Sequence, residues 1–148
     1  MANFFSYKGK LIELHKESLR ATMGSQTHED SLEALRKILI SSMRNGETLC
    51  VATGKLGMDF KEKWTDEKIF PAHLVFNFKE WRDQDKEIYM PFVKENENHG
   101  VGGLNPGHGY ICSGDWQMCI VSETDDAETL QTIMGSLPLD QFECLIVA

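Results

Sequence analysis

The sequence lacks a long hydrophobic run. None of its segments approaches the roughly 20 apolar residues that a membrane-spanning helix requires. Residues 1–8 also lack the basic start, apolar stretch and cleavage site of a secretory signal. We therefore expect a soluble, cytoplasmic protein that is not embedded in a membrane.

Clusters of Lys and Arg are missing as well. The 148 residues carry 15 basic and 23 acidic side chains, which gives a formal net charge of −8. Nucleic acids and anionic membrane surfaces both require a basic face on the protein that binds them. We therefore expect no nucleic-acid or membrane partner, and the charge favours a protein partner instead.

Cysteines are few and irregularly spaced. Cys50, Cys112, Cys119 and Cys144 form no C-x-x-C motif, and three of them lie within apolar, strand-like runs. In such runs cysteine behaves as a small buried hydrophobic residue. Free thiols are the expected state, and a disulfide framework is not.

An intact nucleotide-binding motif is also absent. The segment 100–109 contains five glycines and a proline, but it matches no phosphate-binding fingerprint, and a strand is expected after it where such a motif requires a helix. Thr53-Gly54-Lys55 is similar to the end of a phosphate-binding loop, yet Leu56 occupies the position of the magnesium-binding hydroxyl. We interpret both segments as surface connections and expect no cofactor.

Metal and nucleophile sites are weakly indicated. His99, His108 and Cys112 are too few for a structural zinc site, which usually has four protein ligands. A pair of His108 with Cys112 or Cys119 would lie among acidic residues, which raise a thiol pKa. The acid pairs Asp125/Asp126 and Glu95/Glu97 are typical of helix caps and solvated faces. We therefore predict no catalytic residue and no metal.

The last third of the chain is predicted to form a β-α-β unit. Residues 116–121 and 142–147 each read as a strand, and the second is the most hydrophobic run in the chain. Between them, Asp125 and Glu128 have the spacing of a capping box, and apolar residues at helical spacing follow until Gly135 and Pro138. We expect the final strand to lie inside the sheet.

Upstream, the patterns predict alternating helices and strands. The expected helices are residues 10–22, a helix that opens with a capping box at Asp30 and Glu33 and closes at Gly46, and residues 81–98, kinked at Pro91. The expected strands are residues 48–52 and 73–78. In the second helix we expect Leu32, Leu35, Ile38, Leu39 and Met43 to be buried and Glu33, Arg36, Lys37 and Arg44 to face water. Phe60, Trp64, Trp81 and Trp116 are predicted to be packing anchors.

These elements predict one α/β domain with a central, mainly parallel or mixed sheet of four or five strands flanked by helices. Residues 1–25 are expected to form an N-terminal helical arm, with Phe4, Phe5 and Tyr7 near its start, and residues 26–148 the domain.

The segments 35–51 and 116–122 resemble part of an AAA-type P-loop domain of the dynein-like pattern: a helix that ends in glycine, a strand, an insertion and a later strand that ends in a polar residue. The nucleotide-binding motif is missing, so the resemblance implies a degenerate P-loop domain without ATPase activity. Domains of this kind occur in cytoskeletal and ciliary proteins. The resemblance therefore implies a non-catalytic interaction or scaffold module in such an assembly.

Residues 120–139 are similar to the second half of muconolactone-isomerase-like ferredoxin-fold proteins. This second resemblance implies an α+β arrangement βαββαβ over residues 72–148, with a strand at 110–113. It implies a small dimeric enzyme or ligand-binding protein with a pocket beside the glycine-rich loop. The ligand-binding candidates there are His108, Tyr110, Cys112 and Asp115. A parallel neighbour at 48–52 for the strand at 116–121 would favour the P-loop-like alternative, and an antiparallel neighbour at 110–113 the ferredoxin-like one.

Overall fold

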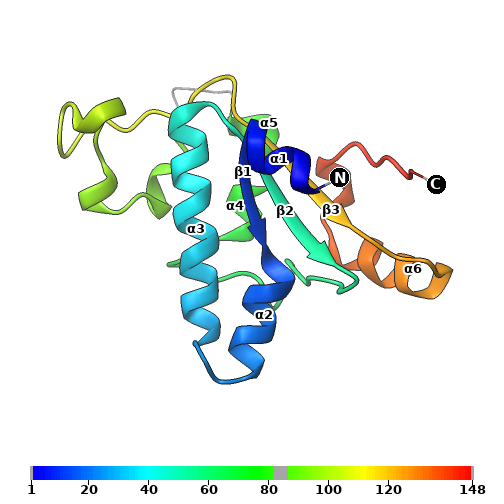
Figure 1. Ribbon diagram of the computed structural model, residues 1–148. Coiled ribbons are helices and arrows are strands. Elements are labelled where there is room, and N and C mark those ends of the chain that lie inside the picture. Colours follow the sequence, from blue (N-terminus) through cyan, green and yellow to red (C-terminus); the bar gives the residue numbers. More distant parts are fainter. Residues whose placement is uncertain (1, 82–86, 148) are drawn as a thin grey trace.

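The protein is built on a three-stranded parallel sheet. The computed structural model describes residues 2–81 and 87–147. Strands β1 (Gly9–Glu13), β2 (Thr48–Gly54) and β3 (Gln117–Ser122) lie in the order β1-β2-β3. Helix α3 (His28–Asn45) runs along one side of the sheet, and α6 (Ala127–Ser136) lies beyond the end of β3 (Figure 1). The α/β class is confirmed, although the described chain forms three strands and not the four or five expected.

Short helices connect and cover the strands. They are α1 (Ala2–Lys8), α2 (Leu14–Thr22), α3 (His28–Asn45), α4 (Ala72–Val75), α5 (Phe78–Trp81) and α6 (Ala127–Ser136), with the 3₁₀ helices η1 (Met90–Phe92), η2 (Glu95–Glu97), η3 (Val101–Gly103) and η4 (Leu139–Gln141). Among the described residues, no helix combines the length and the apolar character that crossing a membrane requires.

Helix α3 is the longest element, and its ends are well defined. Thr27 is the N-cap: its side chain accepts a hydrogen bond from the Asp30 amide, and the Asp30 carboxylate accepts one from the Thr27 amide. The predicted capping box at Asp30 and Glu33 was therefore placed three residues too late. Gly46 ends the helix with φ of +68°, as predicted, because this left-handed conformation suits glycine.

The first half of the predicted helix 10–22 is wrong. Residues 9–13 form β1, which pairs in parallel with β2 from Gly9 opposite Thr48 to Glu13 opposite Ala52. Only Leu14–Thr22 is helical. Ile12 is the buried residue of β1, and pairing with β2 prevails over the helical spacing of the apolar residues. The segment that we expected as an arm, residues 1–25, thus contributes an edge strand to the sheet.

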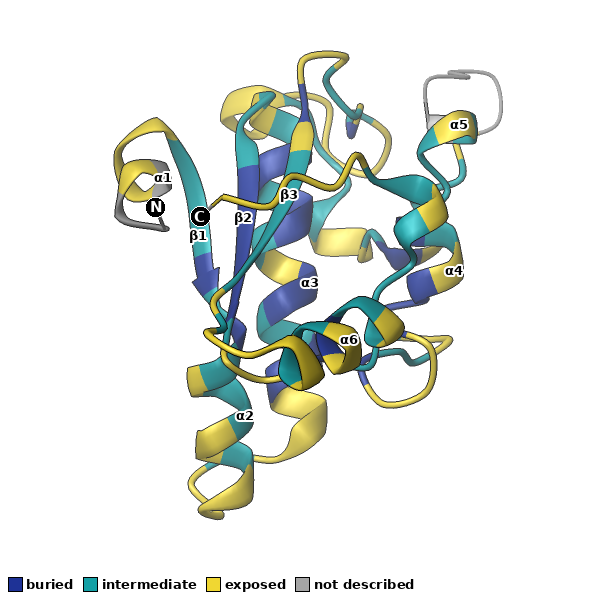
Figure 2. Cartoon of the chain, turned by 90° about the vertical axis from the view of Figure 1, so that its right-hand side faces the viewer, coloured by how far each residue is buried: buried dark blue, intermediate teal, exposed yellow. Residues whose placement is uncertain are grey.

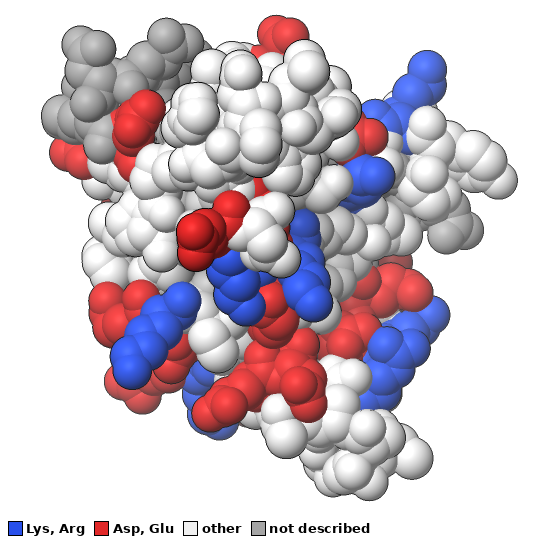
Figure 3. Space-filling model, turned by 90° about the vertical axis from the view of Figure 1, so that its left-hand side faces the viewer, with Lys and Arg blue, Asp and Glu red and all other residues white. Residues whose placement is uncertain are grey.

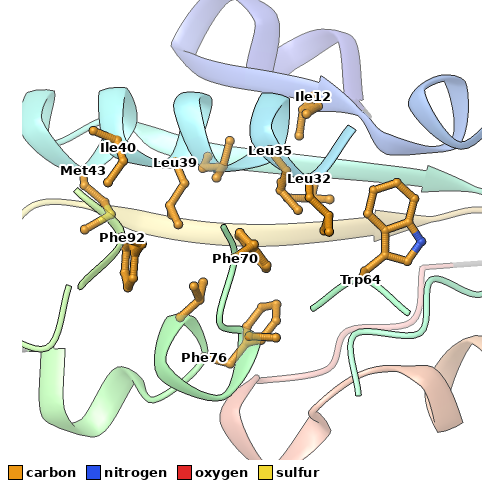
Figure 4. Close-up of a cluster of buried hydrophobic side chains, with 14 of the residues drawn as sticks. Ile12, Leu32, Leu35, Leu39, Ile40, Met43, Trp64, Phe70, Phe76 and Phe92 are labelled. Carbon is orange, nitrogen blue, oxygen red and sulfur yellow. The ribbon is translucent and has the colours of Figure 1, made fainter. Parts of the chain in front are cut away.

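The core lies between α3 and a group of aromatic side chains from residues 60–92. Figure 4 shows the side chains of α3 pointing toward Phe70, Phe76 and Phe92. Leu35, Leu39 and Met43 have no exposed surface, whereas Ile38 is half-buried. The anchors Phe60, Trp64 and Trp116 are buried as predicted. The side chain of the fourth anchor, Trp81, lies outside the described residues.

The segment 71–98 is helical and irregular where we expected a strand and a long helix. Residues 72–75 form α4 and residues 78–81 form α5, where we predicted a strand at 73–78. Pro71 stands at the start of α4, and the rings of Phe76 and Phe78 pack edge to face with their centroids 6.1 Å apart. Residues 87–98 contain only η1 and η2, and Pro91 lies in η1. Residues 82–86 of the predicted helix lie outside the described residues.

Two expected strands near the end of the chain are absent. Residues 110–113 and 142–147 are irregular, and 143–147 are exposed; in the view of Figure 2 they pass in front of the strands. The β-α-β prediction is therefore wrong in its last strand, and the ferredoxin-like arrangement lacks the strands it requires. Asp126, not Asp125, caps α6: its carboxylate accepts a hydrogen bond from the Thr129 amide at 2.7 Å.

Candidate functional site

Strand β3 is an open edge of the sheet. The Glu123 amide donates a hydrogen bond to the Gly54 carbonyl at 2.9 Å, and the Val121 carbonyl accepts one from the Thr53 hydroxyl. Backbone groups alternate sides along a strand, so those of Met118, Ile120 and Ser122 point away from β2. No described strand pairs with them.

The two edges of the sheet differ in charge. β1 carries Lys10 and Glu13, and charges of this kind discourage pairing with a further strand. β3 has the sequence Gln-Met-Cys-Ile-Val-Ser, without a charge or a proline. Only β3 therefore presents an unprotected edge.

An apolar groove of about 730 Å³ follows this edge. One wall is β3 itself, and the other consists of residues 137–147, with Phe78 and residues 112–116 at one end. Among the described residues that line the groove, Glu143 is the only charged one, and none is Lys, Arg or His. The volume lies within the range typical of ligand pockets, and the apolar, half-open shape suits a chain segment more than a polar small molecule.

The outer wall of the groove packs against the core through Leu137 and Phe142. The ring of Phe142 lies 5.6 Å from that of Phe76 and 5.3 Å from that of Phe78. Beyond it, Leu145 is 85%, Ile146 68% and Val147 64% exposed. These three consecutive aliphatic side chains form an exposed apolar stretch at the outer wall of the groove.

Three of the four cysteines line this groove, and all four are free thiols. Cys119 faces buried Cys50 across the β2–β3 pair, and the hydrogen bond between them lowers the pKa of Cys119 and raises that of Cys50. Burial raises the pKa of Cys112 to about 11. Cys144 is exposed. The groove thus holds thiols of different reactivity.

The four ligand-binding candidates do not meet at one site. His108 and Asp115 are exposed, and Cys112 lines the groove from a half-buried position. Tyr110 is buried: its hydroxyl donates a hydrogen bond to the Ile40 carbonyl at 2.9 Å, and burial raises its pKa. Tyr110 therefore attaches its segment to α3 and presents no polar group to a pocket.

The glycine-rich segment is a surface connection, as we expected. Residues 101–108 are all exposed, and within residues 2–81 and 87–147 no three His, Cys, Asp or Glu side chains are grouped as metal ligands. Lys55, in the second phosphate-like segment, lies 3.2 Å from Asp125, and both are exposed.

Arg36 was expected to face water, but it is fully buried. Its guanidinium donates two hydrogen bonds to each of Glu33 and Glu97 and one to the Phe92 carbonyl, at 2.6–2.9 Å. Burial lowers the pKa of Arg36, but the bonds to the two carboxylates outweigh it and keep the pKa above its usual value. Glu97 is therefore a structural ion-pair partner and not part of a solvated acid pair.

Sequence reasoning missed this cluster because its members are far apart in the chain. The Glu33–Arg36 spacing of three residues is the only local signal, and it also fits an exposed helix pair. On the face of the molecule shown in Figure 3, acidic and basic side chains lie next to one another. The ion pairs of Arg36 with Glu33 and Glu97 connect α3 to η2 and stabilise the fold.

Comparison of the chain with models of known families, with curated proteins and with solved structures gave no match. The site is therefore interpreted from its own geometry.

Proposed function

We propose that the chain is a non-catalytic protein-interaction module whose docking surface is the groove beside β3. The uncharged, unpaired edge of β3 inside an apolar groove carries this proposal. An extended segment of a partner would hydrogen-bond to the outward backbone groups of Met118, Ile120 and Ser122 and place alternate apolar side chains in the groove.

The assembly in which the module would act is a cytoplasmic, cytoskeletal or ciliary one. This part of the proposal rests on the resemblance to degenerate AAA-type domains. That resemblance predicts a parallel strand at 48–52 beside the strand at 116–121. The parallel pairing of β2 with β3 supports it. The exposed side chains of Phe4 and Tyr7 on α1 fit a second contact through residues 1–24.

The experiment is a selection of extended peptides on the purified protein, followed by hydrogen exchange on the complex. A selected peptide is expected to protect the amides of Met118, Ile120 and Ser122, which point away from β2. Binding should be lost in Val121→Lys, which changes the groove lining, and retained in Val101→Lys, on the glycine-rich loop. Circular dichroism would verify that both variants fold.

Protection confined to other residues, with the β3 amides unchanged, would refute the docking surface. Hydrogen exchange on the unaltered protein keeps the test valid even if Val121→Lys does not fold.

A further inference from the structure

The chain carries both a groove and a segment that suits it. Residues 144–147 (Cys-Leu-Ile-Val) are uncharged, and the three aliphatic ones are largely exposed. They are rich in the residue types that favour strands. In its own chain, however, this segment does not pair with β3, and in the view of Figure 2 it passes in front of the strands at an angle to them.

The reason lies at the start of the segment. Phe142 packs against the rings of Phe76 and Phe78, so the following residues line the far wall of the groove and do not pair with β3 as a strand. In Figure 1 the end of the chain lies well to the side of the sheet. The edge of β3 and the aliphatic side chains beyond Phe142 are thus both left without a strand partner in one molecule.

We propose that two copies of this chain pair by exchange, so that residues 143–147 of each molecule lie along β3 of the other. The inference rests on the proposed function, because it uses the same groove and names a second copy as its occupant. Each sheet would gain a fourth strand, and the exchange would bury the exposed aliphatic side chains of both molecules.

The charges of the two surfaces fit this occupant. Glu143 is the only charged residue among the described residues of the lining, and it belongs to the exchanged segment itself, so the described lining that stays behind carries no charge. Because it stands at the start of the segment, it remains at the rim when the uncharged residues 144–147 enter the groove, so no charge is buried. The contact uses the same two surfaces on both molecules, which gives a closed dimer and not an open filament.

Sedimentation of the purified protein over a wide range of concentrations tests the proposal. The wild-type protein is expected to form a dimer. The double variant Leu145→Lys/Val147→Lys should weaken the self-association by about 100-fold or more, since two charges would enter an apolar groove.

The chain offers a matched control in Val101→Lys/Leu104→Lys. Val101 is 65% and Leu104 68% exposed, so the same chemical change is made at similarly exposed residues far from the groove. This control is expected to remain a dimer.

The native cysteines provide an independent test. Protein with Cys112→Ser/Cys144→Ser is mixed with protein carrying Cys112→Ser/Cys119→Ser and treated with oxidised glutathione. One Cys119 thiol and one Cys144 thiol then join as a disulfide, while glutathione disulfide takes up the two electrons and two protons and becomes two thiols. Peptide mass spectrometry is expected to find a Cys119–Cys144 disulfide between the two molecules.

Three results would overturn the exchange: a wild-type protein that is monomeric at every concentration, a dimer that tolerates the two lysines in the segment, or no intermolecular Cys119–Cys144 disulfide. A monomer that still binds the selected peptide at β3 would refute the exchange alone. Loss of the β3 protection as well would refute the proposed function with it.

Discussion

Replacing Arg36 with Met tests the buried ion-pair cluster most directly. The methionine retains much of the volume but removes a charge whose side chain is 1% exposed, and it leaves Glu33 and Glu97 without their main partner. Removing one partner of a buried ion pair costs about 3–5 kcal/mol. Because both carboxylates retain about a fifth of their exposure, we expect a loss of about 2–3 kcal/mol in the free energy of unfolding at pH 7.

The pH dependence of this loss follows from the Glu33 carboxylate. Hydrogen bonds from Arg36, helped by Lys94, lower its pKa from 4.5 to about 2 despite partial burial. A lowered pKa in the folded state stabilises the protein above pH 4.5, and this contribution disappears as the pH falls from 4.5 to 2. The difference between wild type and Arg36→Met should therefore narrow by about 1–2 kcal/mol at pH 3, after allowance for solvent screening.

Urea unfolding followed by tryptophan fluorescence at pH 7 and pH 3 provides the measurement. Lys37→Met is the control, since it removes the same charge from the next residue of α3, where the side chain is 66% exposed. Its effect should stay below about 0.5 kcal/mol. The reasoning fails if Arg36→Met costs no more than Lys37→Met at pH 7, or if its cost is equal at both pH values.

Three further predictions concern the glycines, the helix cap and the thiols. Gly46→Ala should lower the free energy of unfolding by about 1–2 kcal/mol in thermal unfolding, because φ at Gly46 is +68° and an added Cβ would lie 2.7 Å from Ser113 Oγ. In contrast, Gly135→Ala in α6 should be neutral or stabilising by up to about 1 kcal/mol, because an added Cβ there would have no atom within 4 Å. Thr27→Ala should cost about 1 kcal/mol by loss of the α3 cap, and Thr27→Ser should retain most of it. In the variant Leu145→Lys/Val147→Lys, in which the exchange is weakened, we expect iodoacetamide at pH 8 to modify Cys144 first and Cys119 next, and to leave Cys112 and buried Cys50 unmodified in peptide mass spectra. Equal labelling of all four would contradict the burial and the pKa order.

Elements with strong local signals were predictable from the sequence. α3 combines an apolar stripe with a left-handed glycine, and β2 is a continuous apolar run that lies in the centre of the sheet. The helix after Asp126 was also expected, within one residue at its cap. In each case local propensity and tertiary packing favour the same conformation.

Failures occurred where the deciding contacts are non-local. The segment 142–147 has every local property of a strand, but Phe142 packs into the aromatic cluster with Phe76 and Phe78, and no local pattern reveals that contact. Residues 9–13 look helical until β2 is placed beside them. Of the site candidates, only Cys112 lines the groove, because the groove arises from the missing partner of β3 and not from a motif.

An open apolar edge favours indiscriminate association unless something opposes it. We attribute this opposition to the net charge of −8, which falls toward zero near the sequence pI of about 5.1. Light scattering is therefore expected to rise as the pH is lowered from 7 toward 5, and the rise should be driven by molecules whose residues 145–147 are not held in the groove of a partner. The variant Leu145→Lys/Val147→Lys should scatter less at its own pI than Val101→Lys/Leu104→Lys, although both gain the same two charges. Equal scattering by the two variants would show that net charge alone governs the association, and would remove the exposed segment from the explanation.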